Sequence, residues 1–310
     1  MKTIRLLHKT IGAGLNVASL LAPNAAARRA LSLFATPPRP RLRPKEAEFL
    51  ATARREELIL AGRPVAIYRW GPETGPLALL SYGWAYNAGR WRHFVPGLVE
   101  AGFRVVAYDP PGHGYSPRGE VALPLNASLI AELILYFGQP EVVIAHSFGG
   151  ASTIYALQQL PAEQRPRRAV IMASFSQPSE VFRSFQRTLG LHEMAYWRFV
   201  RHVEKLMNIS LRNMDLARLT ANLGDVRGLV VHDLRDEVTN FRHARRYHAY
   251  WPGCALLATE GKGHHLGSPE VTHDILAFAI DGRLPNRAEY QQQPLPANHD
   301  LVRYFAGLEV

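Results

Sequence analysis

Eight short apolar runs, separated by stretches of helical pattern, constrain the fold of this chain more than any other feature. Several of the runs, VVIA among them, are apolar without interruption. Such runs are typical of strands that are buried on both faces, as in a parallel sheet covered by helices. We therefore expect strands at residues 57–60, 65–69, 77–82, 104–109, 141–146, 169–173, 228–233 and 255–259.

The stretches between the later runs have the length and composition of helices, for example at 93–100, 128–137 and 150–160. Parallel strands need such crossover helices, so the alternation predicts an α/β fold with a mostly parallel, twisted sheet of eight strands and helices on both faces. The first two runs flank Ala61-Gly62-Arg63, which predicts a hairpin. A chain of 310 residues suits one large core with an insertion.

The segment between the sixth and seventh runs is too long for a single crossover helix, and it predicts an inserted helical cap at about 175–225. Its aromatic side chains either line a pocket beneath the cap or form ordinary core, and both readings stay open for Phe182, Phe185, Tyr196, Trp197 and Phe199. The remaining segments are a basic helical arm and proline-rich connector at 1–55, which ends in a short helix at 46–55, the core at 56–285 and a C-terminal extension at 286–310.

The first 35 residues combine basic residues with a moderately apolar stretch. Lys2, Arg5 and Lys9 precede the apolar stretch 11–22, an order that also occurs in export signals. Glycines and polar residues interrupt this stretch, however, and it is too short and too polar to span a bilayer. We expect a helical arm that packs on the domain or touches a membrane surface, with export as the alternative.

The formal charge of +10 comes from 36 Lys and Arg against 26 Asp and Glu, and much of the excess lies in the first 55 residues. Such an excess occurs in proteins that bind nucleic acid or anionic membranes, and also in proteins with a merely solvated basic face. The densest internal cluster, Arg242, His243, Arg245 and Arg246, lacks the interleaved aromatic residues and glycines of a nucleic-acid module. We interpret it as a solvated helix face and expect no nucleic-acid partner.

The single cysteine, Cys254, cannot form an internal disulfide, which favours a reducing, cytoplasmic setting, with peripheral membrane contact through the arm as an addition. No phosphate-binding loop, dinucleotide glycine pattern or zinc-binding helix motif occurs in the sequence. We therefore expect neither a cofactor nor a metal ion.

The strongest chemical indication follows the fifth run. The strand at 141–146 leads into Ala-His-Ser-Phe-Gly-Gly and then a helix, which is the context of a nucleophile elbow. Ala145 and Gly149 are small, as a sharp turn around Ser147 requires, although glycine is more usual than Ala145. A serine hydroxyl becomes a useful nucleophile only when an imidazole takes its proton and a carboxylate orients that imidazole.

The two partners expected for Ser147 lie in the loops after the last two strands. His264 follows the final strand within Gly-Lys-Gly-His-His, with His265 as the alternate. Two aspartates follow the seventh strand, and we prefer Asp236, because Asp233 at the strand end would more readily brace the turn.

An acyl transfer also needs backbone amides that stabilise the developing oxyanion. The amide of Phe148, directly after the serine, is one candidate. The amide of Trp84, in the glycine turn after the third strand, is the other. The segment 112–116 also brings a histidine near a serine, but it has no carboxylate partner and is interpreted as a structural turn.

Five ordered motifs between Glu56 and Asp281 resemble the α/β-hydrolase superfamily, the group that contains bacterial carboxylesterases and lipases. They are Ser-Tyr-Gly-Trp, Asp-Pro-Pro-Gly-His-Gly-Tyr-Ser, Ala-His-Ser-Phe-Gly-Gly, His-Asp-x-x-Asp-x-Val and Gly-x-Gly-His. The resemblance implies Ser147 as nucleophile, Asp236 and His264 as its partners, and the amides of Trp84 and Phe148 as oxyanion donors. Tyr82 stands where relatives often have a histidine, which implies an altered loop with the backbone donor retained.

Together these residues predict a serine hydrolase, specifically a carboxylesterase that acts on small or medium acyl esters through an acyl-serine intermediate. The fold also hosts thioesterases, amidases, carbon–carbon bond hydrolases and acyltransferases, so the bond type stays open. The rival hypothesis is a catalytically silent scaffold that binds a small ligand or a partner protein, with the basic arm as its docking element. The sequence specifies neither the substrate nor the oligomeric state.

Overall fold

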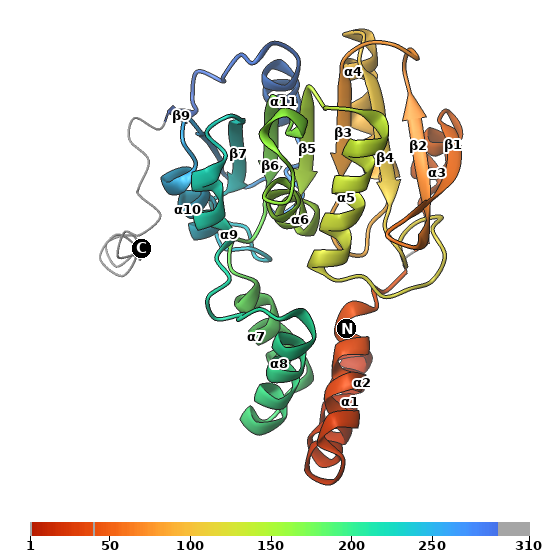
Figure 1. Cartoon of the computed structure of the whole chain (residues 1–310), viewed down its shortest axis with the longest axis vertical. Coiled ribbons are helices and arrows are strands. Elements are labelled where there is room, and N and C mark those ends of the chain that lie inside the picture. The colour runs from red at the N-terminus through yellow and green to blue at the C-terminus, as the bar shows by residue number, and fades with distance from the viewer. Residues whose placement is uncertain (1, 40, 291–310) are drawn as a thin grey trace. The chain divides into compact units, whose positions relative to one another are not determined.

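The computed structural model describes residues 2–39 and 41–290, and a nine-stranded sheet forms the centre of the described core (Figure 1). The strands are β1 (Arg54–Leu60), β2 (Arg63–Trp70), β3 (Leu77–Ser81), β4 (Arg104–Asp109), β5 (Val142–His146), β6 (Arg168–Met172), β7 (Arg227–Asp233), β8 (Ala255–Thr259) and β9 (Glu289–Tyr290). Their order across the sheet is β1-β2-β4-β3-β5-β6-β7-β8-β9. Strands β3 to β8 run parallel, whereas β1, β2 and β9 are antiparallel to their neighbours.

All eight expected strands are present, and the predicted fold class is confirmed. The hairpin between β1 and β2 turns through Ala61 and Gly62, whose φ angles of 47° and 68° are the two positive values that a tight hairpin needs. The ninth strand pairs with β8 and belongs to the segment expected as a C-terminal extension. Residues 291–310 of that segment lie outside the described residues.

Helices cover both faces of the sheet. They are α3 (Pro44–Ala51), α4 (Val95–Glu100), α5 (Leu123–Phe137), α6 (Phe148–Leu157), α9 (Leu216–Leu219), α10 (Arg242–Tyr250) and α11 (Pro269–Asp281), with 3-10 turns at Ala88–His93, Ala162–Gln164 and Thr220–Asn222. Figure 1 shows α5 and α6 packed together in front of the sheet, while α4 and α11 contact each other behind it. Buried side chains such as Trp91, Leu98 and Phe278 fill the space behind the sheet.

Two local expectations need correction. The helix expected at 46–55 ends at Ala51, because Arg54 already pairs with Arg69 in the first hairpin. The basic cluster on α10 is only half solvated, since His243 and Arg246 are buried at 3% and 5% exposure. This helix covers the sheet, so every third or fourth residue must face inward whatever its charge.

The described contacts divide the chain into two compact units. Among the described residues, 38–39, 41–176 and 216–290 form the core, and 2–37 and 177–215 form a separate helical unit. The helical unit consists of α1 (Lys2–Leu21), α2 (Pro23–Ala35), α7 (Pro178–Leu189) and α8 (Glu193–Met207). The expected N-terminal arm and the expected insertion therefore supply two helices each to one unit.

Aromatic rings fill the interior of the helical unit. Phe34 of α2 lies 4.4 Å from Phe182 and 5.7 Å from Phe199, measured between ring centroids, and Phe182 stacks on Phe199 at 5.2 Å. Of the five aromatic residues singled out in the sequence, Phe182, Tyr196 and Phe199 are buried in this unit, and Phe185 packs against it. Trp197 is 43% exposed. These side chains thus provide the core that the four short helices need.

Helix α1 packs on α7 through a small and polar face. At Gly12, an added Cβ would lie 1.8 Å from the carbonyl oxygen of Leu189, so only glycine allows this approach. The Asn16 side chain donates to the Gly190 carbonyl at 3.0 Å and accepts from the His192 amide at 2.9 Å. These contacts satisfy backbone groups at the end of α7 and fix the rotation of α1 about its own axis.

Two glycines of α1 provide a matched test of this packing. Gly14 has open space around its Cα, so Gly14→Ala should leave stability unchanged or raise it by up to about 1 kcal/mol through helix propensity. Gly12→Ala forces α1 away from Leu189 and should lower the free energy of unfolding by about 1–3 kcal/mol. Urea unfolding of both variants measures the difference, and equal stability of the two would contradict the packing described here.

Candidate active site

Ser147 occupies the turn between β5 and α6. Its φ of 53° and ψ of −119° lie in a region that side-chain-bearing residues rarely adopt, so the turn is strained. The Ser147 amide donates to the Met172 carbonyl at 2.8 Å, and its carbonyl accepts from the Ser174 hydroxyl at 2.9 Å. These contacts fix a half-buried serine side chain at the carboxyl end of the sheet.

Glycines flank Ser147 where backbone segments come into contact. An added Cβ at Gly149 would lie 2.4 Å from the carbonyl oxygen of Ser81 and 2.6 Å from that of Tyr82. On the facing loop, an added Cβ at Gly83 would lie 3.0 Å from Cβ of Ser147. The first turn of α6 and the loop after β3 therefore meet without intervening side chains.

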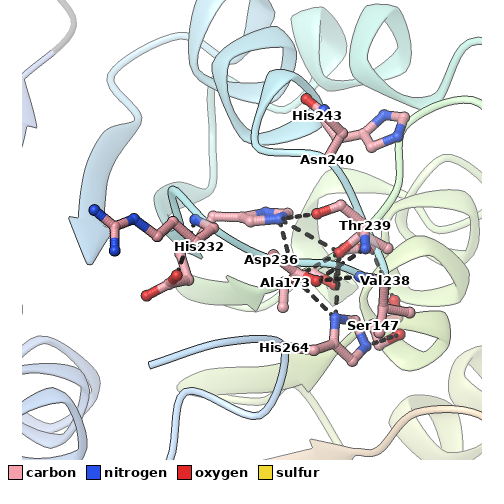
Figure 2. Close-up of polar contacts among 12 residues, drawn as sticks. Ser147, Ala173, His232, Asp236, Val238, Thr239, Asn240, His243 and His264 are labelled. Atoms are coloured by element: carbon pink, nitrogen blue, oxygen red, sulfur yellow. Dashed lines mark hydrogen bonds and ion pairs between the residues drawn. The ribbon is translucent and has the colours of Figure 1, made fainter. Parts of the chain in front are cut away.

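The three residues that the sequence proposes as a triad lie in hydrogen-bond contact, as Figure 2 shows. Nε2 of His264 is 3.0 Å from Oγ of Ser147, and Nδ1 of His264 is 2.8 Å from Oδ2 of Asp236. An ionised carboxylate only accepts, so Nδ1 carries the proton and the lone pair of Nε2 faces the serine hydroxyl. The His264 side chain is 12% exposed and that of Asp236 is fully buried.

The Asp236 carboxylate is held by more donors than His264 alone. Oδ1 accepts from the amides of Val238 and Thr239 at 2.8 and 2.9 Å, and Oδ2 accepts from the Thr239 hydroxyl at 2.8 Å. Burial alone would raise the pKa of Asp236, but hydrogen bonds from His232, His264 and the Thr239 amide outweigh it and hold the pKa far below its usual value. Asp236 is therefore ionised at neutral pH.

Thr239 and His232 are parts of this arrangement that the sequence did not reveal. The Thr239 hydroxyl also lies 3.3 Å from Nδ1 of His264 and 3.1 Å from the carbonyl of Ala173. Nε2 of His232 lies 2.8 Å from the Thr239 carbonyl and 3.3 Å from Oδ2 of Asp236 (Figure 2). The spacing Asp-x-x-Thr is a signal for such a turn, in which a carboxylate accepts from its own following backbone.

His265 and Asp233, the alternates to His264 and Asp236, make other contacts. His265 is hydrogen bonded through Nε2 to the Tyr86 hydroxyl at 2.6 Å. Asp233 accepts from the Arg235 and Lys262 amides at 2.9 and 2.7 Å and from the Thr259 hydroxyl at 2.9 Å. Asp233 thus ties the turn after β7 to the loop that carries His264, while Asp236 contacts the imidazole.

The two residues expected to supply oxyanion donors lie on the facing segments beside Ser147. Phe148 is the first residue of α6, and Trp84 follows Gly83 in the loop after β3; their rings meet edge to face at 5.5 Å. The amide of Phe148 is at a helix N-terminus, where N–H groups lack an intrahelical acceptor. Among the described residues, no side chain accepts from either amide.

His113 braces the loop that carries Trp84. Its Nε2 accepts from the Ala85 amide at 2.9 Å, and its Nδ1 donates to the Pro111 carbonyl at 3.1 Å. Ala85 has a φ of 59°, so this bond stabilises a backbone conformation that alanine rarely adopts. The segment 112–116 forms a turn, as expected, and in addition positions the neighbouring loop.

Tyr82, the departure from the family pattern noted in the sequence, stacks on His146 with ring centroids 4.7 Å apart. Nε2 of His146 donates to the backbone carbonyl of His264 at 2.8 Å. This bond joins the residue before Ser147 to the loop that carries the His264 imidazole. Burial and, secondarily, the neighbouring His264 lower the pKa of His146 to about 3. His146 is therefore neutral.

Comparison with known proteins places the chain in a family. A family model for the alpha/beta hydrolase fold matches residues 76–266, and the chain belongs to this family. That range contains Ser147, Asp236 and His264.

Individual relatives are distant. A segment of 107 residues is 30% identical to a bifunctional esterase/perhydrolase of Acinetobacter calcoaceticus, and it covers 34% of this chain and 39% of that protein. An uncharacterized protein of Mycobacterium bovis is 26% identical over an aligned length of 288, gaps included, and the alignment covers 76% of this chain and 82% of that protein. Among solved structures, carboxylesterase CesB from Bacillus subtilis aligns with a TM-score of 0.57 at 16% identity, over 84% of this chain and 99% of that chain. This structural likeness concerns the fold.

The buried neutral histidines predict how stability depends on pH. Burial lowers the pKa of His113 to about 4 and that of His146 to about 3, from an ordinary value of 6.5. Between pH 6.5 and 4 the unfolded chain binds protons at these positions and the folded protein does not, so stability falls as the pH falls. In this range each of the two histidines lowers the free energy of unfolding by at most about 1.4 kcal/mol for each unit that the pH falls.

The measurement is urea unfolding of the wild type and of His113→Gln at several pH values between these limits. Because glutamine does not titrate, the variant should show a shallower pH dependence than the wild type. An identical dependence in both proteins would mean that His113 is not held neutral.

Proposed function

We propose that this protein is a serine hydrolase, specifically a carboxylesterase that acts on small or medium acyl esters. The observation that carries the proposal is the hydrogen-bonded series from Oγ of Ser147 through His264 to the buried carboxylate of Asp236. This arrangement provides a nucleophile, a base and a group that orients the base, which are the requirements of acyl transfer through serine.

The first half of the proposed reaction forms an acyl-serine. Oγ of Ser147 attacks the ester carbonyl carbon while Nε2 of His264 takes the hydroxyl proton. The carbonyl oxygen becomes an oxyanion, which the amides of Phe148 and Trp84 stabilise. The carbon–oxygen bond to the alcohol then breaks, and the departing oxygen takes the proton from Nε2.

The second half releases the acid. A water molecule gives a proton to Nε2 of His264 as its oxygen attacks the acyl carbon, and a second oxyanion forms at the same amides. When the bond to Ser147 breaks, Oγ recovers the proton from Nε2. The ionised Asp236 favours both steps because its charge stabilises the imidazolium that forms twice in each cycle.

Two further features support an ester with an apolar portion. The rings of Trp84 and Phe148 adjoin the proposed oxyanion donors and offer apolar surface there. One relative carries esterase in its name, and another is called a monoacylglycerol lipase, with 30% identity over 104 residues that cover 30% of this chain and 37% of that protein.

Hydrolysis of p-nitrophenyl esters of increasing acyl length tests the proposal, with a fluorophosphonate label as a parallel readout. Ser147→Ala should lower kcat by about 10³-fold or more and abolish labelling, because no other group replaces the nucleophile. Ser128→Ala on α5, whose hydroxyl donates to the Pro124 carbonyl of the same helix, is the matched control and should keep both the rate and the labelling. A folded wild type that neither labels nor hydrolyses any of these esters would favour the silent scaffold.

Thr239 provides a second test, as a positioning residue that acts through Asp236. Thr239→Val removes the hydroxyl that contacts Asp236 and His264 but keeps the shape, and we expect kcat to fall about tenfold with KM nearly unchanged. Thr239→Ser retains the hydroxyl and should restore most of the rate. Equal rates for the valine and serine variants, or a change confined to KM, would contradict this role.

A further inference from the structure

Helix α1 exposes an apolar face along most of its length. The exposed side chains are Leu6 at 69%, Leu7 at 57%, Val17 at 59%, Leu20 at 62% and Leu21 at 82%. At 100° per residue these positions fall within an arc of about 140°, and the intervening exposed residues of the arc are Thr10, Ala13 and Gly14. The described part of this face therefore carries no charge.

The outward position of this face is fixed by the packing of the helix. The opposite side of α1, with Gly12, Asn16 and Ser19, contacts α7, α8 and the turn between them, and the Ser19 carbonyl accepts from Arg198. A helix on a water-exposed surface normally turns its apolar side inward and its polar side outward. Helix α1 buries Leu15 in the interior of the unit but leaves these five other large apolar side chains exposed, which is typical of a face that binds an apolar partner.

Positive charge is concentrated in the same unit. Residues 1–37, its first segment, contain five Lys and Arg and no Asp or Glu. The helical unit as a whole has eleven Lys and Arg against four Asp and Glu, so it holds most of the net charge of the chain. Arg28 and Arg29 on α2 are exposed and form no ion pair within the described part of the chain.

A hollow between α1 and α2 adds to this surface. It has a volume of about 410 Å³ and is lined by apolar side chains, among them Ile11, Ala18 and Leu33, together with Arg29. An apolar hollow with a guanidinium at its edge matches an acyl chain that ends in an anionic headgroup.

We propose that the α1–α2 side of the helical unit binds the surface of an anionic lipid membrane. The apolar side chains of α1 enter the headgroup region, and Arg28 and Arg29 bind lipid phosphates. No described helix is long and apolar enough to cross a bilayer. In the proposed arrangement α1 lies in the plane of the interface. Charge favours a membrane over a second copy of this chain as the occupant, because two copies would bring like charges together.

Vesicle sedimentation of the full chain tests the proposal. The vesicles contain phosphatidylcholine alone or with about 30 mol% phosphatidylglycerol. The wild type should bind the anionic vesicles, and binding should weaken when the salt concentration rises from about 0.05 M to about 0.5 M. The double variant Leu20→Asp/Leu21→Asp should bind at least about tenfold more weakly, because it removes two apolar anchors and adds negative charge.

The matched control is Leu135→Asp on α5. Leu135 is also exposed, at 58%, but it lies on the larger α/β unit and not on the helical unit. Leu135→Asp should bind vesicles like the wild type. The thermal unfolding temperature of each variant shows that it is folded, independently of any enzymatic activity. Ser147→Ala should bind vesicles normally, so failure of the proposed esterase activity and failure of membrane binding can be told apart.

Two results would overturn the proposal. One is equal binding of the wild type, the double variant and Leu135→Asp to anionic vesicles. The other is a wild type that does not bind vesicles and elutes as a dimer in size-exclusion chromatography, while Leu20→Asp/Leu21→Asp elutes as a monomer. That result would mean that a second copy of the chain covers this face.

Discussion

The direct contact between the β5–α6 turn and the loop after β3 is the constraint on which the candidate site depends. At Gly149 there is no room for a Cβ against the backbone of Ser81 and Tyr82, and a Cβ at Gly83 would be in tight contact with Ser147, so the two segments approach each other closely. The parallel sheet positions both segments, because β3 and β5 are adjacent and end at the same edge. The serine and the loop that carries Trp84 therefore keep their relative position through this close contact and through the hydrogen bond from the Ala85 amide to His113.

Around that contact, hydrogen bonds and burial determine the protonation states of one carboxylate and two histidines. Asp236 is surrounded by donors and is ionised, whereas His113 and His146 are desolvated and neutral. Each neutral histidine uses its ring to hold a backbone group, His113 at Ala85 and His146 at His264. His264 is the imidazole that contacts both the Ser147 hydroxyl and the Asp236 carboxylate, which is the geometry that the proposed general base catalysis needs.

The sheet and the three residues of the candidate site that contact one another could be predicted from the sequence because their signals are local. An apolar run followed by a small-residue turn identifies Ser147, and the strand-end loops identify Asp236 and His264. The supporting contacts could not be predicted in the same way, because His113 binds Ala85 of a different loop. The pairing of α1 and α2 with α7 and α8 was also inaccessible, since helical periodicity shows that a face is apolar but not which helix covers it.

The helical unit is discontinuous in the chain, and this bears on how the protein is made. Its first two helices end at Ala35, while α8 ends at Met207, so the whole first part of the core is synthesised in between. At about 5–20 residues per second, α1 and α2 leave the ribosome roughly 10–30 s before their partners exist. During that interval the aromatic interior of the unit is open, and Phe34 has no neighbours from α7 and α8 to cover it. The order of synthesis thus leaves the apolar sides of the N-terminal helices uncovered until the helices that later enclose them have been made.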